Sequence, residues 1–173
     1  MKNNNLLLAY QEQLIYGCVD DYSAIAALSG YLGNLNGQDP LKWAHAVTDF
    51  LYLNHISGLI EVFQPENYPF IDDLKDNLMQ EMDSNGQITS LDQWAPNWMA
   101  MLFYSTQKTH DLTTRYGLKY QHMVDQPIHP VFMNTILKIY SDFDTLTLGC
   151  DEAAAHQRIA VAKRVIHQLT NPN

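Results

Sequence analysis

The sequence has few charged residues, few cysteines and no long apolar run, and each of these features excludes a class of protein. Charged residues are 17% of its 173 residues and hydrophobic residues 46%, a composition typical of globular and not of disordered proteins. No apolar run approaches the roughly 20 residues of a membrane-spanning helix. The first residues lack a signal-peptide pattern, so we expect a cytoplasmic protein with no membrane association. The length predicts one globular domain over residues 1–173.

Cysteine and metal-ligand patterns are equally sparse. Cys18 and Cys150 are the two cysteines, and their separation matches no redox or zinc motif. There are seven histidines, but pairs such as His45 and His55 lack the i, i+4 spacing beside a glutamate that helical zinc hydrolases use. We therefore expect neither a metal ion nor a cofactor.

Basic residues are outnumbered, with 10 Lys and Arg against 19 Asp and Glu and a formal net charge of -9. Affinity for nucleic acids comes largely from Lys and Arg on phosphates. Here these residues are scattered, with one small group at Lys163 and Arg164. We expect no direct binding of nucleic acid, because an acidic surface is better suited to a basic protein partner and accelerates encounter with it.

Hydrophobic periodicity predicts a mainly α protein, a single-domain helical bundle of about six or seven helices with a small β element. The expected helices cover residues 6–16, 21–32, 40–55, 70–82, 96–116, 130–140 and 151–169. Residues 59–63 are expected to form a strand. A second interpretation of the 96–116 segment stays open, in which residues 99–104 are a buried strand, because periodicity does not separate the two for a short apolar run.

Residues 20–63 show the order helix, helix, strand that is typical of the front of a winged-helix unit. In such a unit the second helix carries Arg, Lys, Asn or Gln to bases and phosphates. That helix would be residues 40–55, where Lys42 is the formal cation. A transcriptional regulator of the winged-helix type is therefore an alternative function, although this helix is poorly suited to reading DNA.

Arg115 and His122 are the candidate catalytic pair. Their spacing resembles the Arg–x(4–6)–His motif of HEPN-type RNases, which are all-helical proteins. The resemblance implies that His122 acts as acid or base and that Arg115 stabilises phosphate charge, roles that suit these side chains. Tyr116 stands where the family has a polar residue, and Gly117 interrupts the helix. This RNase is the second alternative function.

Acidic residues gather in two clusters, one near residues 72–83 and one near residues 142–152. Their members are either plain solvated faces or docking surfaces for Lys and Arg of a partner. The candidate partner-binding residues are Asp72, Asp73, Asp76, Glu81, Asp83, Asp142 and Asp144.

A family-level likeness favours the docking interpretation. The order Asp20-Asp21-Tyr22, a helix, Pro40, and a second helix ending in Gly-Leu-Ile-Glu-Val at residues 58–62 resembles the front of small bacterial immunity proteins of contact-dependent and polymorphic toxin systems. The resemblance covers about the first third of the chain. It implies a non-catalytic protein that binds and neutralises one cognate toxin. Since nuclease toxins need basic surfaces to hold phosphates, the expected partner is a basic nuclease-type toxin domain.

Overall fold

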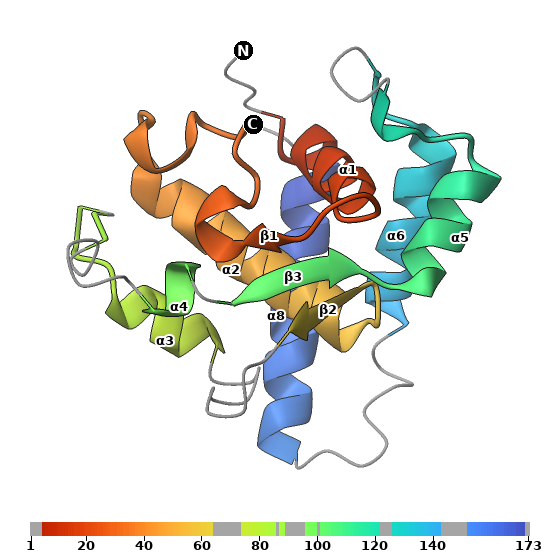
Figure 1. Ribbon diagram of the computed structural model, residues 1–173. Helices are drawn as coiled ribbons and strands as arrows, with labels where there is room; N and C mark the ends of the chain where they lie inside the picture. The colour runs from red at the N-terminus through yellow and green to blue at the C-terminus, as the bar shows by residue number, and fades with distance from the viewer. Residues whose placement is uncertain are drawn as a thin grey trace.

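A computed structural model of the chain describes residues 5–63, 74–85, 87–88, 96–99, 101–121, 126–142 and 152–171. Within these residues the fold is mainly helical and carries a small antiparallel sheet (Figure 1), which confirms the predicted fold class. The helices are α1 (Leu6–Tyr16), α2 (Pro40–Ile56), α3 (Leu74–Gln80), α4 (Pro96–Met99), α5 (Gln107–Arg115), α6 (Pro130–Ser141) and α8 (Glu152–Thr170). Two short 3₁₀ helices are η1 (Ala24–Ala26) and η2 (Asn34–Asn36). None of the described helices is long and apolar enough to cross a membrane.

The sheet joins three segments that are distant in the sequence. Its strands are β1 (Tyr22–Ser23), β2 (Ile60–Phe63) and β3 (Leu102–Ser105), in the order β1-β3-β2 with antiparallel pairing. Phe103 is opposite both Tyr22 and Val62. The strand predicted at residues 59–63 is confirmed as β2.

The single long helix expected over residues 96–116 is wrong, and the alternative strand interpretation is closer to the structure. Along β3, Phe103 and Ser105 are buried, whereas Tyr104 between them is exposed. This period of two is the pattern of a strand with one face on the core. A helix begins only at Gln107, and Gly117 follows its end with φ +67, as expected for a C-terminal glycine.

The helix expected over residues 21–32 is also wrong. This segment contains β1, η1 and a series of turns, with positive φ at Leu28 and Leu32. Side chains from neighbouring helices bond its backbone: Gln13 Oε1 accepts from the Leu28 N–H at 2.9 Å, and Trp43 Nε1 donates to the Ala27 carbonyl at 3.2 Å. Tertiary bonds replace the helical ones, so the helix pair of a winged-helix unit is not formed here.

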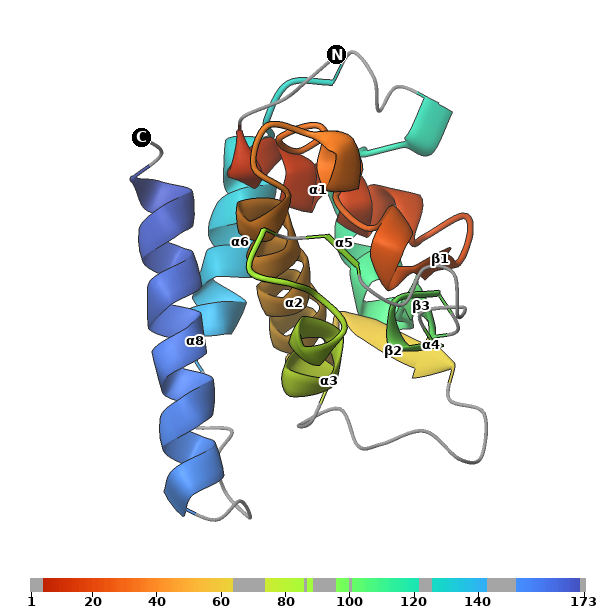
Figure 2. The ribbon, with the colours of Figure 1, turned by 90° about the vertical axis from the view of Figure 1, so that its left-hand side faces the viewer.

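Helix α2 is the central element of the fold. Figure 2 shows α8 on one side of α2 and the sheet on the other, and α2 packs against β2, α3 and α8. Asp39 caps its start by accepting from the Lys42 N–H at 2.9 Å, and Pro40 follows as its first residue, so the helix begins at the predicted residue. The rings of Trp43 and Trp98 stack 5.5 Å apart and are 0% exposed. Much of the aromatic content therefore builds the core instead of a binding surface.

Candidate functional site

A groove lies beside the sheet where the loop after α1 meets the ends of β2 and β3. Its volume is about 530 Å³. We call it the acidic groove. It is lined by Gly17, Cys18, Val19, Asp20, Asp21, Phe63, Leu102, Tyr104, Ser105 and His110.

The strand register decides which side chains reach this groove. Phe103 faces the core and is 0% exposed, so its neighbour Tyr104 projects outward. Glu61 lies opposite Tyr104 in the β2–β3 pair, and its Oε2 accepts a hydrogen bond from the Tyr104 hydroxyl at 2.8 Å. This bond raises the pKa of Tyr104, which keeps the phenol protonated. Two residues along β2 from Glu61, Phe63 shares its outward direction, because strand side chains alternate.

Exposed apolar side chains concentrate at the acidic groove. Val19 is 59%, Phe63 65% and Tyr104 38% exposed. These are three of the six large hydrophobic side chains that are exposed in the described part of the chain. The aromatic surface continues past the groove, since the rings of Tyr16 and Tyr120 meet edge-on at 5.8 Å. Exposed apolar groups gathered in this way mark interaction surfaces.

The charges at the groove are of one sign. Asp20 and Asp21 line it, Glu61 is bonded to its Tyr104, and the lining residues that the structure describes include no Lys or Arg. The Tyr16 hydroxyl approaches Asp20 Oδ2 at 3.5 Å. Carboxylates beside exposed aromatic rings can receive Lys or Arg, whose aliphatic stems pack on the rings while the charged ends reach the acids.

The groove also contains a thiol, Cys18. Burial raises its pKa, and its Sγ donates to the Leu14 carbonyl at 3.3 Å and lies 3.7 Å from Thr113 Oγ1. Because the thiolate is the nucleophilic form, a raised pKa disfavours covalent chemistry at this position.

The structure scatters the acidic residues that the sequence suggested for docking. Asp76 is exposed on α3, and Asp142 is exposed just after α6. Glu81 Oε1 accepts from the Asn97 side chain at 2.8 Å. Asp83 Oδ1 closes a turn by accepting from two backbone N–H groups, those of residues 85 and 87, at 2.8 and 2.9 Å. None of these four lines the acidic groove.

Three further candidates, Asp72, Asp73 and Asp144, lie outside the described residues. So does His122 of the suggested catalytic pair. Its expected partner Arg115 is exposed at the last turn of α5. Within the described residues, no group of three or more His, Cys, Asp or Glu is arranged to hold a metal ion.

Sequence reasoning did not include Asp20 and Asp21 among the candidate partner-binding residues and therefore missed the groove. A usable signal was present in residues 60–63, because alternation along a strand places Phe63 on the same outward face as Glu61. The proximity of that face to residues 17–21 depends on β3, which pairs with both segments.

Comparison with known proteins finds no match for this chain among protein-family models, curated proteins or solved structures. A function for the chain is therefore inferred from its own residues and their geometry.

Proposed function

We propose that this chain is a non-catalytic binding protein that holds a basic protein partner at the acidic groove and neutralises it. The proposed partner is a cognate toxin domain of the nuclease type. One observation carries the proposal: Val19, Phe63 and Tyr104 are exposed on the same groove as Asp20 and Asp21. No Lys or Arg is among the described residues that line this groove.

The arrangement has the composition of a protein interface. Interfaces place aromatic anchors at the centre of the contact and polar groups at the rim. Carboxylates at the rim increase the rate of encounter with a basic surface and disfavour acidic partners. A nuclease domain offers complementary chemistry, because the Lys and Arg that would hold phosphates can instead bind carboxylates.

The segments that resemble immunity proteins also meet at this site. Residues 20–22 and residues 58–62 are far apart in the sequence, yet both pair with β3 around Phe103. The acidic residues of those segments are Asp20, Asp21 and Glu61, and all three lie at or beside the groove. Their convergence supports the proposal.

The test measures association with the basic domain encoded by the neighbouring reading frame, using the purified full chain. In the double variant Asp20→Lys/Asp21→Lys we expect association at low salt to slow by about tenfold or more and to depend less on salt. The matched control is Asp76→Lys/Asp142→Lys, which changes the net charge equally at two exposed residues outside the groove and should leave the rate almost unchanged. Phe63→Ala should act on dissociation instead, as is usual for an interface anchor.

The outcomes distinguish an error in the proposed function from an error in the proposed docking surface. If the domain is toxic and the chain neither binds it nor removes its activity, the proposed function is wrong. If a complex forms and only the Asp76/Asp142 variant weakens it, the protein is a binder but docks through a surface other than the acidic groove. RNA cleavage by the chain alone, lost on His122→Ala, would favour the RNase.

A further inference from the structure

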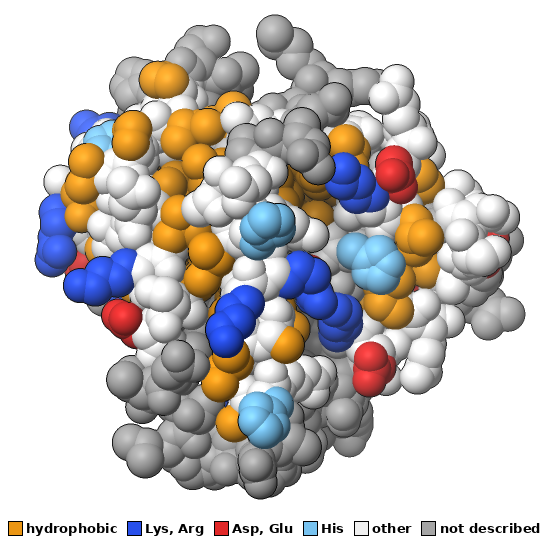
Figure 3. All heavy atoms as spheres, turned by 180° about the vertical axis from the view of Figure 1, so that it is seen from behind, with side chains coloured by type: hydrophobic (Ala, Val, Ile, Leu, Met, Phe, Trp, Pro, Cys, Tyr) orange, Lys and Arg blue, Asp and Glu red, His pale blue; other side chains and the backbone are white. Residues whose placement is uncertain are grey.

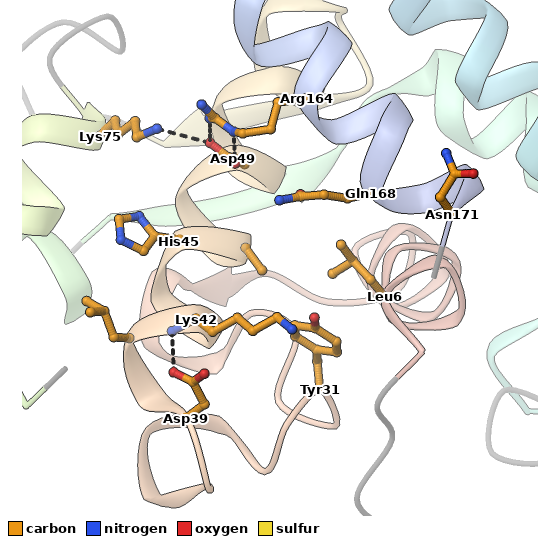
Figure 4. A pocket seen from close by; sticks show the side chains of 12 residues that line it. Leu6, Tyr31, Asp39, Lys42, His45, Asp49, Lys75, Arg164, Gln168 and Asn171 are labelled. Atoms are coloured by element: carbon orange, nitrogen blue, oxygen red, sulfur yellow. Dashed lines mark hydrogen bonds and ion pairs between the residues drawn. The ribbon is translucent and has the colours of Figure 1, made fainter. Parts of the chain in front are cut away.

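A second hollow lies on the opposite side of α2 from the sheet, between α2, α3 and α8 (Figure 4). Its volume is about 630 Å³. We call it the α2–α8 hollow. Its lining residues come from α2 and its cap (Asp39, Leu41, Lys42, His45, Ala46, Asp49), from α8 and the residue after it (Arg164, Gln168, Asn171), and from elsewhere in the chain (Leu6, Tyr31, Lys75). A volume of this size lies within the range of about 300–1,000 Å³ that small-molecule sites occupy.

Helical spacing explains why polar side chains gather here. Lys42, His45 and Asp49 are three and four residues apart on α2, so they form one stripe along that helix. Arg164 and Gln168 are four residues apart on α8 and form a facing stripe. In Figure 4, Lys42 and Gln168 extend from the two helices into the space between them.

A buried carboxylate fixes two of the cations. Asp49 is 4% exposed. Its Oδ1 binds Lys75 Nζ at 3.2 Å, and both its oxygens accept from the Arg164 guanidinium, with the Nε contact at 3.1 Å. Since one carboxylate holds two cations, part of their charge and several N–H donors remain for a further anion. A guanidinium held in this way is already ordered before a ligand arrives, which lowers the entropic cost of binding.

Among the described residues that line the hollow, cations outnumber carboxylates by three to two. Its cations are Lys42, Lys75 and Arg164, and its two carboxylates, Asp39 and Asp49, are both engaged: Asp39 caps α2 and Asp49 holds its two cations. The Lys42 ammonium has no hydrogen bond or ion pair within the part of the chain that the structure describes. Figure 3 shows Lys, Arg and His side chains gathered on this face, over α8. Three of the ten Lys and Arg residues of the chain line the hollow.

We propose that the α2–α8 hollow binds a small organic anion. Its carboxylate or phosphate group is held by Lys42, and the cations fixed on Asp49, about two turns further along α2, add positive charge to the same hollow. Its apolar part lies against the aliphatic and aromatic part of the lining, which includes Leu6, Tyr31 and Leu41. This site is separate from the acidic groove, so it does not depend on the function proposed for that groove.

The test is an NMR titration of the full chain with phenyl phosphate and with benzoate, two anions that carry one small apolar group. We expect at least one to bind saturably below about 1 mM, with amide shifts confined to residues of the hollow. Lys42→Gln should weaken that binding about tenfold, because a charge-assisted bond is lost. The matched control Lys138→Gln removes one charge from α6, outside the hollow, and should leave the affinity unchanged. Inorganic phosphate, which has no apolar part, should bind at least fivefold more weakly than phenyl phosphate.

Three results would overturn this inference. The first is the absence of saturable shifts for both compounds up to about 10 mM, a range that covers weak specific sites. The second is an equal affinity in Lys42→Gln and in the unmodified chain. The third is inorganic phosphate binding as tightly as phenyl phosphate, which would leave an adventitious ion only. Lys42 is exposed and only its backbone N–H takes part in the cap, so the substitution should not disturb folding.

Discussion

The effects of Asp49 and Arg164 on the free energy of unfolding should be coupled. Arg164, although partly exposed, should stabilise the fold more than the arginine of a surface ion pair usually does. Replacing Arg164 by Ala leaves a carboxylate that is 4% exposed with Lys75 as its remaining partner. Uncompensated buried charges cost about 3–5 kcal/mol, and the surviving lysine places this case near 2–3 kcal/mol. Asp49→Ala should cost less, about 1–2 kcal/mol, because the cations it releases have side chains 43% and 23% exposed and can be hydrated.

In the double variant, removal of Arg164 should add only about 0.5 kcal/mol, since the buried charge is already gone; the coupling energy is then about 2 kcal/mol. Urea unfolding followed by the fluorescence of Trp43 and Trp98, both 0% exposed, measures each free energy. At this chain length Arg164→Ala should lower the melting temperature by about 5–10 °C. Additive single effects, or a cost below about 0.5 kcal/mol for Arg164→Ala as for a surface pair, would refute the reasoning.

Two further predictions concern pH and capping. Burial raises the pKa values of Tyr10, Tyr22 and Tyr140 above the ordinary tyrosine value. The contribution of these neutral phenols to the free energy of unfolding should therefore be complete below about pH 10. Above that pH it should fall by up to ~1.4 kcal/mol per pH unit for each tyrosine. Unfolding free energies that stay constant between pH 9 and 11 would contradict this. His129 caps α6 by accepting from the Phe132 N–H at 3.1 Å, so His129→Ala should cost about 1 kcal/mol in urea unfolding and His129→Asn should recover most of it. Equal stability of these two variants would show that the capping hydrogen bond does not stabilise the fold.

The helices that could be predicted are those whose signals are local. Asp39 and Pro40 start α2 and Pro130 starts α6, while for α5 only the end, which Gly117 follows, could be predicted. Each signal acts through backbone groups within one turn, so neighbours in the sequence are sufficient to establish it.

The errors occurred where distant partners decide the conformation. Residues 27 and 28 have apolar spacing suited to a helix, but Trp43 and Gln13 bond their backbone groups and hold them in turns. The segment around Phe103 alternates in burial because strands on both sides pair with it. Helix propensity is a weak preference that such tertiary bonds override.

For the two candidate sites, too, some features follow from the sequence and others only from the tertiary structure. Residue types and helical spacing in the sequence are enough to place Lys42, His45 and Asp49 on one stripe, and to show that the chain is acidic overall. The sequence also establishes the mainly helical class, since apolar periodicity and caps are properties of neighbouring residues. Only the tertiary structure sets Arg164 against Asp49 and Val19 beside Phe63. Both contacts join segments far apart in the chain. Packing around α2 brings the first pair together and pairing with β3 brings the second together, and no local preference of the chain does either.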